Sequence, residues 1–317
     1  MTQTLLYVPG ALQSDSGRFR LEKSTWDFPT ESSDQHITAL HPYPARFIPA
    51  IPCQAIRLFG KSGGVVWDPF AGCGTTLVEA TSAGLSAAGI DTNPLACLLQ
   101  RVYTTRLNSN DWASVSDFGV RVGIRREPPA LNDSLSVRSD IPALAHWFGE
   151  GSIRAIDAYL RSMESAELSQ AAEDVARFAL SRVVVRLSRQ QSDTQYRAVR
   201  PDPTVEAALM TLDLSVRETL SVLRSRLPTG PGPRVEVRNG DARDPKTYDG
   251  LEGPDLVVTS PPYPNSYEYW LYHKYRMFWL GMDPIWARSH EIGARPFYSG
   301  TGKMGPAEFT ADLRSVM

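Results

Sequence analysis

The stretch Val65-Val66-Trp67-Asp68-Pro69-Phe70-Ala71-Gly72-Cys73-Gly74-Thr75-Thr76 decides the fold. Its apolar start predicts a buried strand that ends at Asp68. Gly72 and Gly74 follow in a turn, where the absence of a Cβ lets the backbone pass close to a ligand. Because a helix is expected directly after the turn, its first backbone N–H groups would be free to bind an anion.

The residues after this turn complete a strand–helix–strand unit. A helix is expected over residues 75–83, closed by Gly84, and a second strand over residues 86–90. Asp91 ends that strand 23 residues after Asp68, a spacing that suits a carboxylate binding ribose hydroxyls. This order of elements is typical of the first half of a doubly wound α/β domain.

A glycine-rich turn by itself leaves the ligand open, because nicotinamide enzymes, flavoproteins and methyltransferases all contain one. Here the G-x-G spacing lacks a third glycine, and Thr76 and Leu77 stand in its neighbourhood. A dinucleotide needs room for its pyrophosphate, so the missing glycine disfavours a dinucleotide.

A second motif, TSPPY at residues 259–263, also ends a predicted strand. Pro261 and Pro262 fix the backbone and remove two N–H donors, which leaves carbonyl and side-chain oxygens as acceptors. Tyr263 adds a flat aromatic face. Acceptors beside an aromatic ring suit a planar heterocycle with an exocyclic amino group. An ordinary proline-rich turn is the alternative, and the first motif in the same sheet makes it less favoured.

Breaks in the hydrophobic pattern predict four segments. Residues 1–40 would form an irregular N-terminal segment, and residues 41–100 the first half of the α/β domain. Residues 101–230 would form a helical insertion, and residues 231–317 the second part of the α/β domain. Helices are expected over residues 141–163, 171–187, 213–227 and 268–280, and further strands over 234–238 and 256–259. Residues 41–52 contain four prolines and are expected to be extended, with a short helix following over residues 54–59.

Composition excludes several classes of protein. With 317 residues, 42% hydrophobic and 21% charged, the chain is expected to be globular rather than disordered. No apolar run is long enough for a transmembrane helix, and no basic residue precedes the short apolar stretch at the N-terminus, so a secretory signal is not expected. The three cysteines cannot form a disulfide framework and lack histidine pairs for zinc, which favours a reducing cytoplasmic setting without a metal.

The basic residues are mostly arginine, with 5 lysines among the 33 cations and therefore 33 − 5 = 28 arginines. Arginine suits phosphate recognition because its planar fork binds two oxygens at once. Arg182, Arg186 and Arg189 share one face of a predicted helix, and Arg197 follows in a polar loop. A surface that contacts nucleic-acid phosphates is one interpretation, and a solvated helix face is the other. The net charge of −2 permits a nucleic-acid partner without arguing for one.

The sequence DPFAGCGTT followed by TSPPY resembles the S-adenosylmethionine-dependent amino-methyltransferases of DNA. The serine-first form SPPY is similar to that of enzymes that methylate N4 of cytosine. HPYPARFIP, at residues 41–49, resembles the N-terminal element that helps to enclose the methionine end of the cofactor. The resemblance covers residues 41–100 and 234–281. It implies a class I methyltransferase fold with a Rossmann-like doubly wound sheet.

The resemblance also implies roles for individual residues. Asp68, Phe70, Gly72 and Gly74 would bind S-adenosylmethionine around its methionine portion, with Thr75 or Thr76 near its carboxylate. Asp91 would bind the ribose, and Asp241 the adenine amino group. Thr259, beside the catalytic motif, would also contact the cofactor. The catalytic residues would be Ser260, Pro261, Pro262 and Tyr263.

These catalytic residues would act on a base flipped out of double-stranded DNA. Ser260 and the Pro261 carbonyl would hold the target amine, and Tyr263 would stack on the base. Acceptors that draw the amine hydrogens toward a tetrahedral arrangement restore the nucleophilicity of the nitrogen, which stabilises the transition state.

Methylation of cytosine N4 in a restriction–modification or epigenetic setting is therefore the expected function. Adenine-N6 methylation of DNA and guanine-N2 methylation of RNA are alternatives, although enzymes of the latter kind usually have Asp or Asn where Ser260 stands. A non-catalytic subunit that binds cofactor or DNA is a further alternative. A nicotinamide oxidoreductase is disfavoured because TSPPY has no use there.

Four strands are detected where this class normally has seven. When the strands are numbered along the chain, their expected order across the sheet is third, second, first, fourth. The fourth strand would then be an open edge. We therefore expect the chain to be incomplete at its C-terminal end, either truncated or half of a split enzyme. A second polypeptide that completes the sheet, or a cognate restriction endonuclease, would then be its protein partner.

The tripeptide at residues 52–54 imitates a different catalytic motif. Pro52-Cys53-Gln54 has the form of the nucleophile motif of cytosine-C5 methyltransferases. In that family the motif follows the glycine-rich turn, whereas here it precedes the turn. Cys53 is therefore not expected to be catalytic, and Cys73 is expected to fill space beside the turn.

Overall fold

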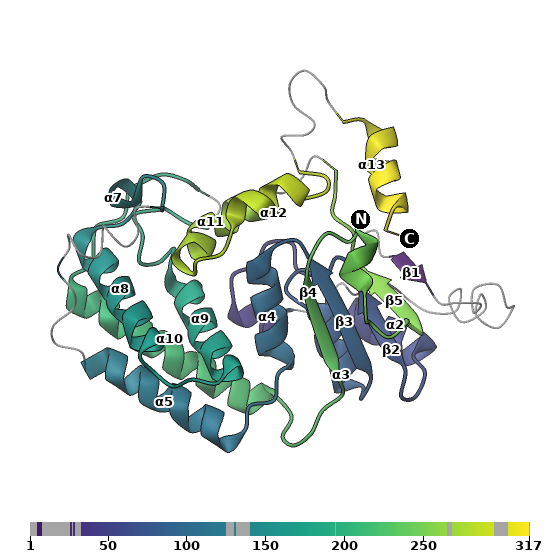
Figure 1. The fold of residues 1–317 in the computed structure, drawn as a ribbon, viewed down its shortest axis with the longest axis horizontal. Coiled ribbons are helices and arrows are strands. Elements are labelled where there is room, and N and C mark those ends of the chain that lie inside the picture. Colours follow the sequence, from purple (N-terminus) through teal and green to yellow (C-terminus); the bar gives the residue numbers. More distant parts are fainter. Residues whose placement is uncertain are drawn as a thin grey trace, which may run out of the picture.

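The computed structural model describes residues 5–7, 26, 28, 33–124, 130, 140–193, 195–264, 268–294 and 304–316. Within them the chain forms a five-stranded sheet with a body of helices beside it (Figure 1). The strands lie in the order β1 (Leu5–Tyr7), β5 (Leu256–Thr259), β2 (Val65–Asp68), β3 (Ser86–Asp91) and β4 (Val235–Asn239). Strands β2 to β5 are parallel, and β1 runs antiparallel to β5.

The four strands expected from the sequence are all present, and their order in the sheet is the expected one. Parallel pairing aligns β5 with β2, β2 with β3, and β3 with β4. The carboxyl ends of the four strands therefore lie at the same edge of the sheet. This alignment brings residues that are almost 200 positions apart in the sequence into contact.

The expectation that β5 is an open edge was wrong, as was the expectation that residues 1–40 are wholly irregular. Strand β1 pairs with β5, with Leu5 opposite Thr259 and Tyr7 opposite Val257. A three-residue strand is too short to show an alternating pattern, so no pattern in the sequence predicted it. The pairing supplies backbone partners to an edge that would otherwise be unpaired.

Three helices cover one face of the sheet: α2 (Ala50–Phe59), α3 (Thr75–Ser82) and α4 (Pro94–Thr104). A core cluster lies between α2, α3 and the strands and includes Ala55, Leu77, Val66, Leu256 and Val258. Their burial explains why β2 and β5 have nearly continuous apolar sequences. On the other face, the ring of Tyr248 stacks on Trp67 at a centroid distance of 5.4 Å.

Helix α2 begins at Ala50 and includes Pro52, so the expectation of an extended chain up to Pro52 was wrong at its end. Proline is tolerated in the first turn of a helix because the N–H groups there have no partner within the helix. Pro49 occupies the N-cap position just before that turn.

The helical body follows α4 in the chain (Figure 1). It consists of α5 (Ser109–Ile124), α7 (Leu144–Trp147), α8 (Glu150–Glu164), α9 (Gln170–Val183) and α10 (Val205–Arg226). After β5 come α11 (Tyr269–Trp279), α12 (Pro284–His290) and α13 (Pro306–Arg314). Short 3-10 helices are η1 (Ser33–Gln35), η2 (Ile37–Leu40) and η3 (Pro245–Tyr248). Helix α5 was not expected, and α10 begins eight residues earlier than expected, where Thr204 caps it by accepting from the Ala207 N–H.

The helical body shares its hydrophobic core with α4 and α11. One cluster of buried side chains includes Leu98 of α4, Phe118 of α5, Phe178 of α9, Leu212 of α10 and Trp279 of α11. An ion pair of 2.6 Å between Arg101 and Asp174 also joins α4 to α9. The body is therefore packed onto the sheet domain through α4. Within the described part of the chain, no helix combines the length and apolar character that crossing a membrane requires.

Gly89 lets α3 and α4 pack close to β3. A Cβ at this position would lie 2.5 Å from Oε1 of Gln100 and 2.8 Å from Cδ2 of Leu77. We predict that Gly89→Ala lowers the free energy of unfolding by about 1–3 kcal/mol, because the fully buried Gln100 and Leu77 have no room to move. Urea denaturation followed by fluorescence measures the change. Gly253→Ala is the matched control, because its Cβ would have nothing within 4 Å, and it should change stability by less than about 0.5 kcal/mol. Equal effects of the two substitutions would contradict the packing argument.

Candidate active site

A cavity lies at the carboxyl ends of β2, β3, β4 and β5, and both sequence motifs line it. The glycine-rich turn contributes Asp68 to Cys73 and Thr75, and the second motif contributes Ser260 to Tyr263. Further walls come from the segment before α2, from the start of α11 and from the end of α12. The structure therefore brings the two motifs together in one site.

A buried hydrogen bond joins the motifs. The Thr259 hydroxyl donates to Oδ1 of Asp68 over 2.5 Å, and the N–H of Phe70 donates to the same oxygen over 3.1 Å. Asp68 is 2% exposed. Burial raises the pKa of Asp68 to about 6, although these hydrogen bonds act in the opposite direction. Thr259 itself does not line the cavity, so it acts through Asp68.

Asp91 shapes the glycine-rich turn as well as lining the cavity. Its Oδ2 accepts from the N–H of Gly72 over 2.8 Å, and its Oδ1 accepts from the N–H of Asn93 over 2.8 Å. The side-chain amide of the fully buried Gln100 donates to the Gly72 carbonyl over 2.9 Å. Burial raises the pKa of Asp91 to about 6. Gly72 is thus held on both sides, at a φ of +50° that favours glycine.

Gly74 and Thr76 were expected to contact the cofactor, but neither lines the cavity. Gly74 is the N-cap of α3, with a φ of +89°, and a Cβ there would lie 2.9 Å from Cγ of Gln100. Thr76 is 1% exposed within the first turn of α3. Thr75 does line the cavity.

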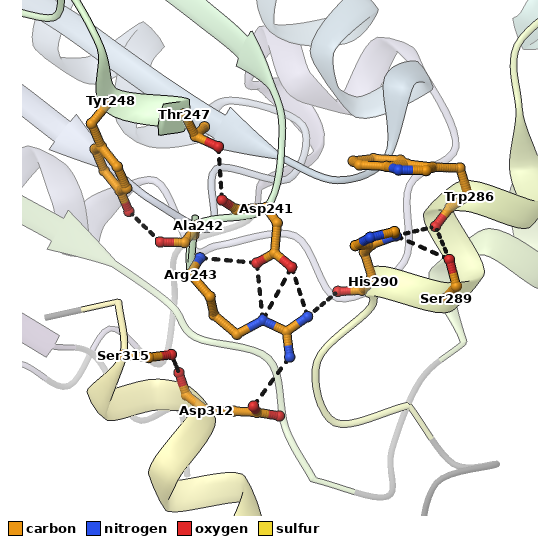
Figure 2. A network of polar contacts seen from close by, with 10 residues as sticks. All are labelled: Asp241, Ala242, Arg243, Thr247, Tyr248, Trp286, Ser289, His290, Asp312 and Ser315. Carbon is orange, nitrogen blue, oxygen red and sulfur yellow. Dashed lines mark hydrogen bonds and ion pairs between the residues drawn. The ribbon is translucent and has the colours of Figure 1, made fainter. Parts of the chain in front are cut away.

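Asp241 lies in the cavity wall at the end of β4, in a network of polar contacts (Figure 2). Arg243 donates to its carboxylate from Nη2 over 2.7 Å and from Nε over 3.0 Å. The same guanidinium pairs with Asp312 of α13 over 3.1 Å. Partial burial opposes ionisation of Asp241, but the Arg243 hydrogen bonds prevail and hold its pKa below the ordinary value. Its backbone is fixed as well, because the hydroxyl of Thr247 donates to the Asp241 carbonyl over 2.9 Å.

Tyr43 is a cavity residue that the sequence did not single out individually. Its ring stacks on Tyr269 at 5.9 Å and on His273 at 5.0 Å, both in α11. It also lies 3.5 Å from the position of a Cβ on Gly72. Tyr43 thus bridges the glycine-rich turn and the helix that follows the second motif. The segment HPYPARFIP was the available signal for it.

Glu291 is a second cavity residue that the sequence did not reveal. Its Oε1 accepts from the N–H of Tyr269 over 2.7 Å, and its Oε2 accepts from the N–H of Trp270 over 3.3 Å. These are the first N–H groups of α11, which have no partner within the helix. Burial raises the pKa of Glu291 to about 8, and the nearby Asp91 and Glu268 add to the effect. No local pattern relates a residue after α12 to the start of α11.

The four arginines considered for phosphate contacts divide into two pairs. Arg182 donates to Thr219 and Leu40 and pairs with Glu218, and Arg189 pairs with Asp202 over 2.6 Å, so these two arginines hold protein elements together. Arg186 and Arg197 are exposed and form no ion pair with the described residues. Arg182 and Arg189 are thus occupied by protein partners, which does not support phosphate contact by these two residues. Helix α9 ends at Val183, so the expectation that Arg182, Arg186 and Arg189 share one helix face was wrong.

Cys53 and Cys73 differ in their position relative to the cavity. Cys53 is exposed on α2 and does not line the cavity, whereas Cys73 is buried in its wall. Burial raises the pKa of Cys73 to about 11, so its thiol is protonated near neutral pH. No group of three or more metal-binding side chains occurs among the residues that the structure describes.

A Rossmann-like parallel sheet that gathers these groups at its carboxyl edge is of the class I methyltransferase type. Comparison with known proteins agrees. Residues 11–100 match the model of the N6/N4 family described as DNA methylase. Over these residues the chain is similar to the DNA amino-methyltransferases, and the matches do not separate cytosine-N4 from adenine-N6 enzymes.

Two curated relatives are both named as type II methyltransferases. M.MjaII of Methanocaldococcus jannaschii is 37% identical over 68 residues, which are 22% of this chain and 13% of the relative. M.MvaI of Kocuria varians is 31% identical over 118 residues, which are 35% of this chain and 25% of the relative. The chain thus matches a quarter or less of the length of each relative. No solved structure matches the chain significantly.

We predict that Thr259→Val lowers the free energy of unfolding by about 1–3 kcal/mol, because it leaves the buried Asp68 carboxyl without one of its hydrogen bonds. Denaturant titration measures the change. Thr211→Val is the matched control, since its hydroxyl donates within α10 at an exposed position, and it should cost less than about 0.5 kcal/mol. Thr259→Ser keeps the hydroxyl and should recover most of the loss. A value for Thr259→Val no larger than that of the control would show that the bond contributes little.

Proposed function

We propose that this chain binds S-adenosylmethionine in the cavity and transfers its methyl group to an exocyclic amine of a base in DNA, with N4 of cytosine as the preferred target. The observation that carries the proposal is the single cavity lined by both the glycine-rich turn and the Ser260–Tyr263 motif. The glycine-rich turn alone would fit any nucleotide-binding site, and the Ser260–Tyr263 motif alone would fit a loop that only packs against the protein. The family match and the type II methyltransferase relatives support the same proposal.

The charges of the cavity fit this cofactor. Four carboxyl groups line it, from Asp68, Asp91, Asp241 and Glu291. Among the described lining residues, Arg46 and His290 can carry a positive charge. An acidic cavity suits a ligand with a cationic sulfur and a cationic amino group, and Arg46 offers a partner for its carboxylate. Gly72 lines the cavity without a side chain, so its backbone is open to the ligand.

When bound there, S-adenosylmethionine supplies a methyl group on a positively charged sulfur. We assign the ribose hydroxyls to Asp91. We assign the adenine amino group to Asp241. Arg243 holds the carboxylate of Asp241 in place. Ser260 and the Pro261 carbonyl accept hydrogen bonds from the target amine, since Pro261 and Pro262 have no N–H to compete. Tyr263 packs against the face of the base.

Serine at the first position of the motif favours cytosine over adenine as the target. Enzymes that methylate guanine N2 in RNA usually have Asp or Asn at this position. A hydroxyl both donates and accepts, whereas a carboxylate only accepts. For contacts with DNA phosphates we propose Arg186 and Arg197, which are exposed and free of ion pairs with the described residues. Arg182 and Arg189 are bound to protein partners and are not part of this proposal.

We predict that the purified chain transfers labelled methyl groups from S-adenosylmethionine to unmethylated genomic DNA and yields N4-methylcytosine on nucleoside mass spectrometry. Ser260→Ala should reduce the rate at least about 100-fold, because it removes an acceptor that acts in the transition state. Thr211→Val, on the exposed side of α10, is the control and should retain the rate.

Other outcomes of this experiment have definite meanings. N6-methyladenine as product would keep the mechanism and overturn the base assignment. Cofactor binding without transfer would overturn catalysis by the chain alone and point to a required second polypeptide. Absence of both binding and transfer would refute the proposed function.

We also predict that the affinity for S-adenosylmethionine falls below pH 6. Because the pKa values of Asp68 and Asp91 are about 6, both lose their negative charge as the pH falls through that value. The cavity then offers less negative charge to a cationic ligand, and the Kd should rise roughly tenfold between pH 7 and pH 5. Calorimetry across this range measures it, with Asp91→Asn expected to bind weakly and with a flatter pH profile. A Kd of the native chain that is constant down to pH 5 would contradict the role of these carboxylates.

A further inference from the structure

Glu291 lines the cavity that the two sequence motifs share. It accepts from the first N–H groups of α11, at Tyr269 and Trp270, and these bonds fix both of its oxygens. Two residues later, Gly293 packs against the second motif, since a Cβ there would lie 2.9 Å from the carbonyl oxygen of Tyr263. Asp91 is close enough to Glu291 to raise its pKa.

Each oxygen of this carboxyl group retains acceptor capacity. A carboxylate has about four lone-pair sites, and Tyr269 and Trp270 use one on each oxygen. Glu291 lines the cavity, so its remaining acceptor capacity is available to a ligand there. Capping α11 alone would not require a cavity-lining carboxyl group beside another buried acid.

We infer that Glu291 is a specificity-determining residue that distinguishes the cationic methyl donor from its neutral-sulfur product. This inference rests on the proposed function. Both compounds share the adenosine and amino-acid parts, and they differ by the methyl group and by the positive charge on sulfur. A buried negative charge in the cavity stabilises the donor and offers nothing to the thioether of the product. The product is thereby released in preference to the donor.

The groups around Glu291 support this assignment. Asp91 of β3, Glu268 before α11 and Tyr43 before α2 interact electrostatically with Glu291. His290 precedes it in the chain, Arg46 also lines the cavity, and Arg288 of α12 lies over the ring of Trp270. Asp91 and Glu268 raise the pKa of Glu291 further above its ordinary value, beyond the effect of burial. Glu291 therefore holds a proton near neutral pH in the free protein, and a cation bound beside it displaces that proton. Binding of the donor should release a proton, and binding of the product should release fewer.

Calorimetric titration of the full chain with S-adenosylmethionine and with S-adenosylhomocysteine tests the inference. We expect the native chain to bind the donor about tenfold or more tighter than the product, and Glu291→Gln to reduce this ratio by about tenfold. Glutamine keeps one acceptor oxygen for the start of α11. Glu268→Gln is the matched control, because Glu268 is a nearby acid that does not line the cavity, and it should leave the ratio within about twofold.

Proton release gives an independent reading. Titrations at pH 7.5 in two buffers of different ionisation enthalpy should show about 0.5–1 proton released per donor bound to the native chain. Glu291→Gln should abolish most of this release. An unchanged affinity ratio in Glu291→Gln, or equal weakening of both ligands, would overturn the inference and leave Glu291 as a helix cap. If the native chain binds neither ligand, the proposed function itself fails, so the two failures are distinct.

Discussion

The hydrogen bond from Thr259 to Asp68 is the contact on which the site depends. It connects the last residues of β2 and β5, two neighbouring parallel strands, at the point where each begins its functional turn. With this bond in place, the glycine-rich turn and the Ser260–Tyr263 segment leave the sheet from fixed positions side by side. The bond is buried, so neither partner can exchange it for water without cost. The sheet supplies the alignment, and this contact fixes the two turns relative to each other.

The cavity buries carboxyl groups, and the protein without a ligand stabilises their ionised forms poorly. Burial raises the pKa of Asp68, Asp91 and Glu291, so ionising each of them costs more in the folded chain than in the unfolded chain. For Asp68 and Asp91, the stability contributed by the protonated form is present below pH 4 and is lost as the pH rises through about 6. A cationic ligand offsets that loss. The cavity is thus preorganised for positive charge, and Asp241 is the exception because Arg243 already neutralises it.

The sequence allowed the central sheet and the two motifs to be predicted, because both depend on local chemistry. Glycines at Gly72 and Gly74 and two prolines at Pro261 and Pro262 restrict the backbone within a few residues, and apolar runs mark the buried parallel strands. Strand β1 escaped prediction because three residues carry no period. Glu291 and Gln100 escaped because their roles arise from tertiary contacts with α11 and Gly72, and no spacing along the chain encodes such contacts. The local sequence does not distinguish Arg182 and Arg189 from Arg186. Only the packing of the chain shows that the first two pair within the protein.

The aromatic contacts of Tyr43 explain how the two halves of the site can respond to one another. Tyr43 lies over Gly72 and stacks on Tyr269 and His273 of α11, and α11 in turn follows the second motif. Helix α11 is also fixed to the helical body, since the buried guanidinium of Arg276 donates to the Ser181 carbonyl in α9. A ligand that moves Tyr43 must therefore disturb α11 and the packing of the helical body. Through α11, the helical body therefore fixes the wall of the cavity that a cofactor and a base would share.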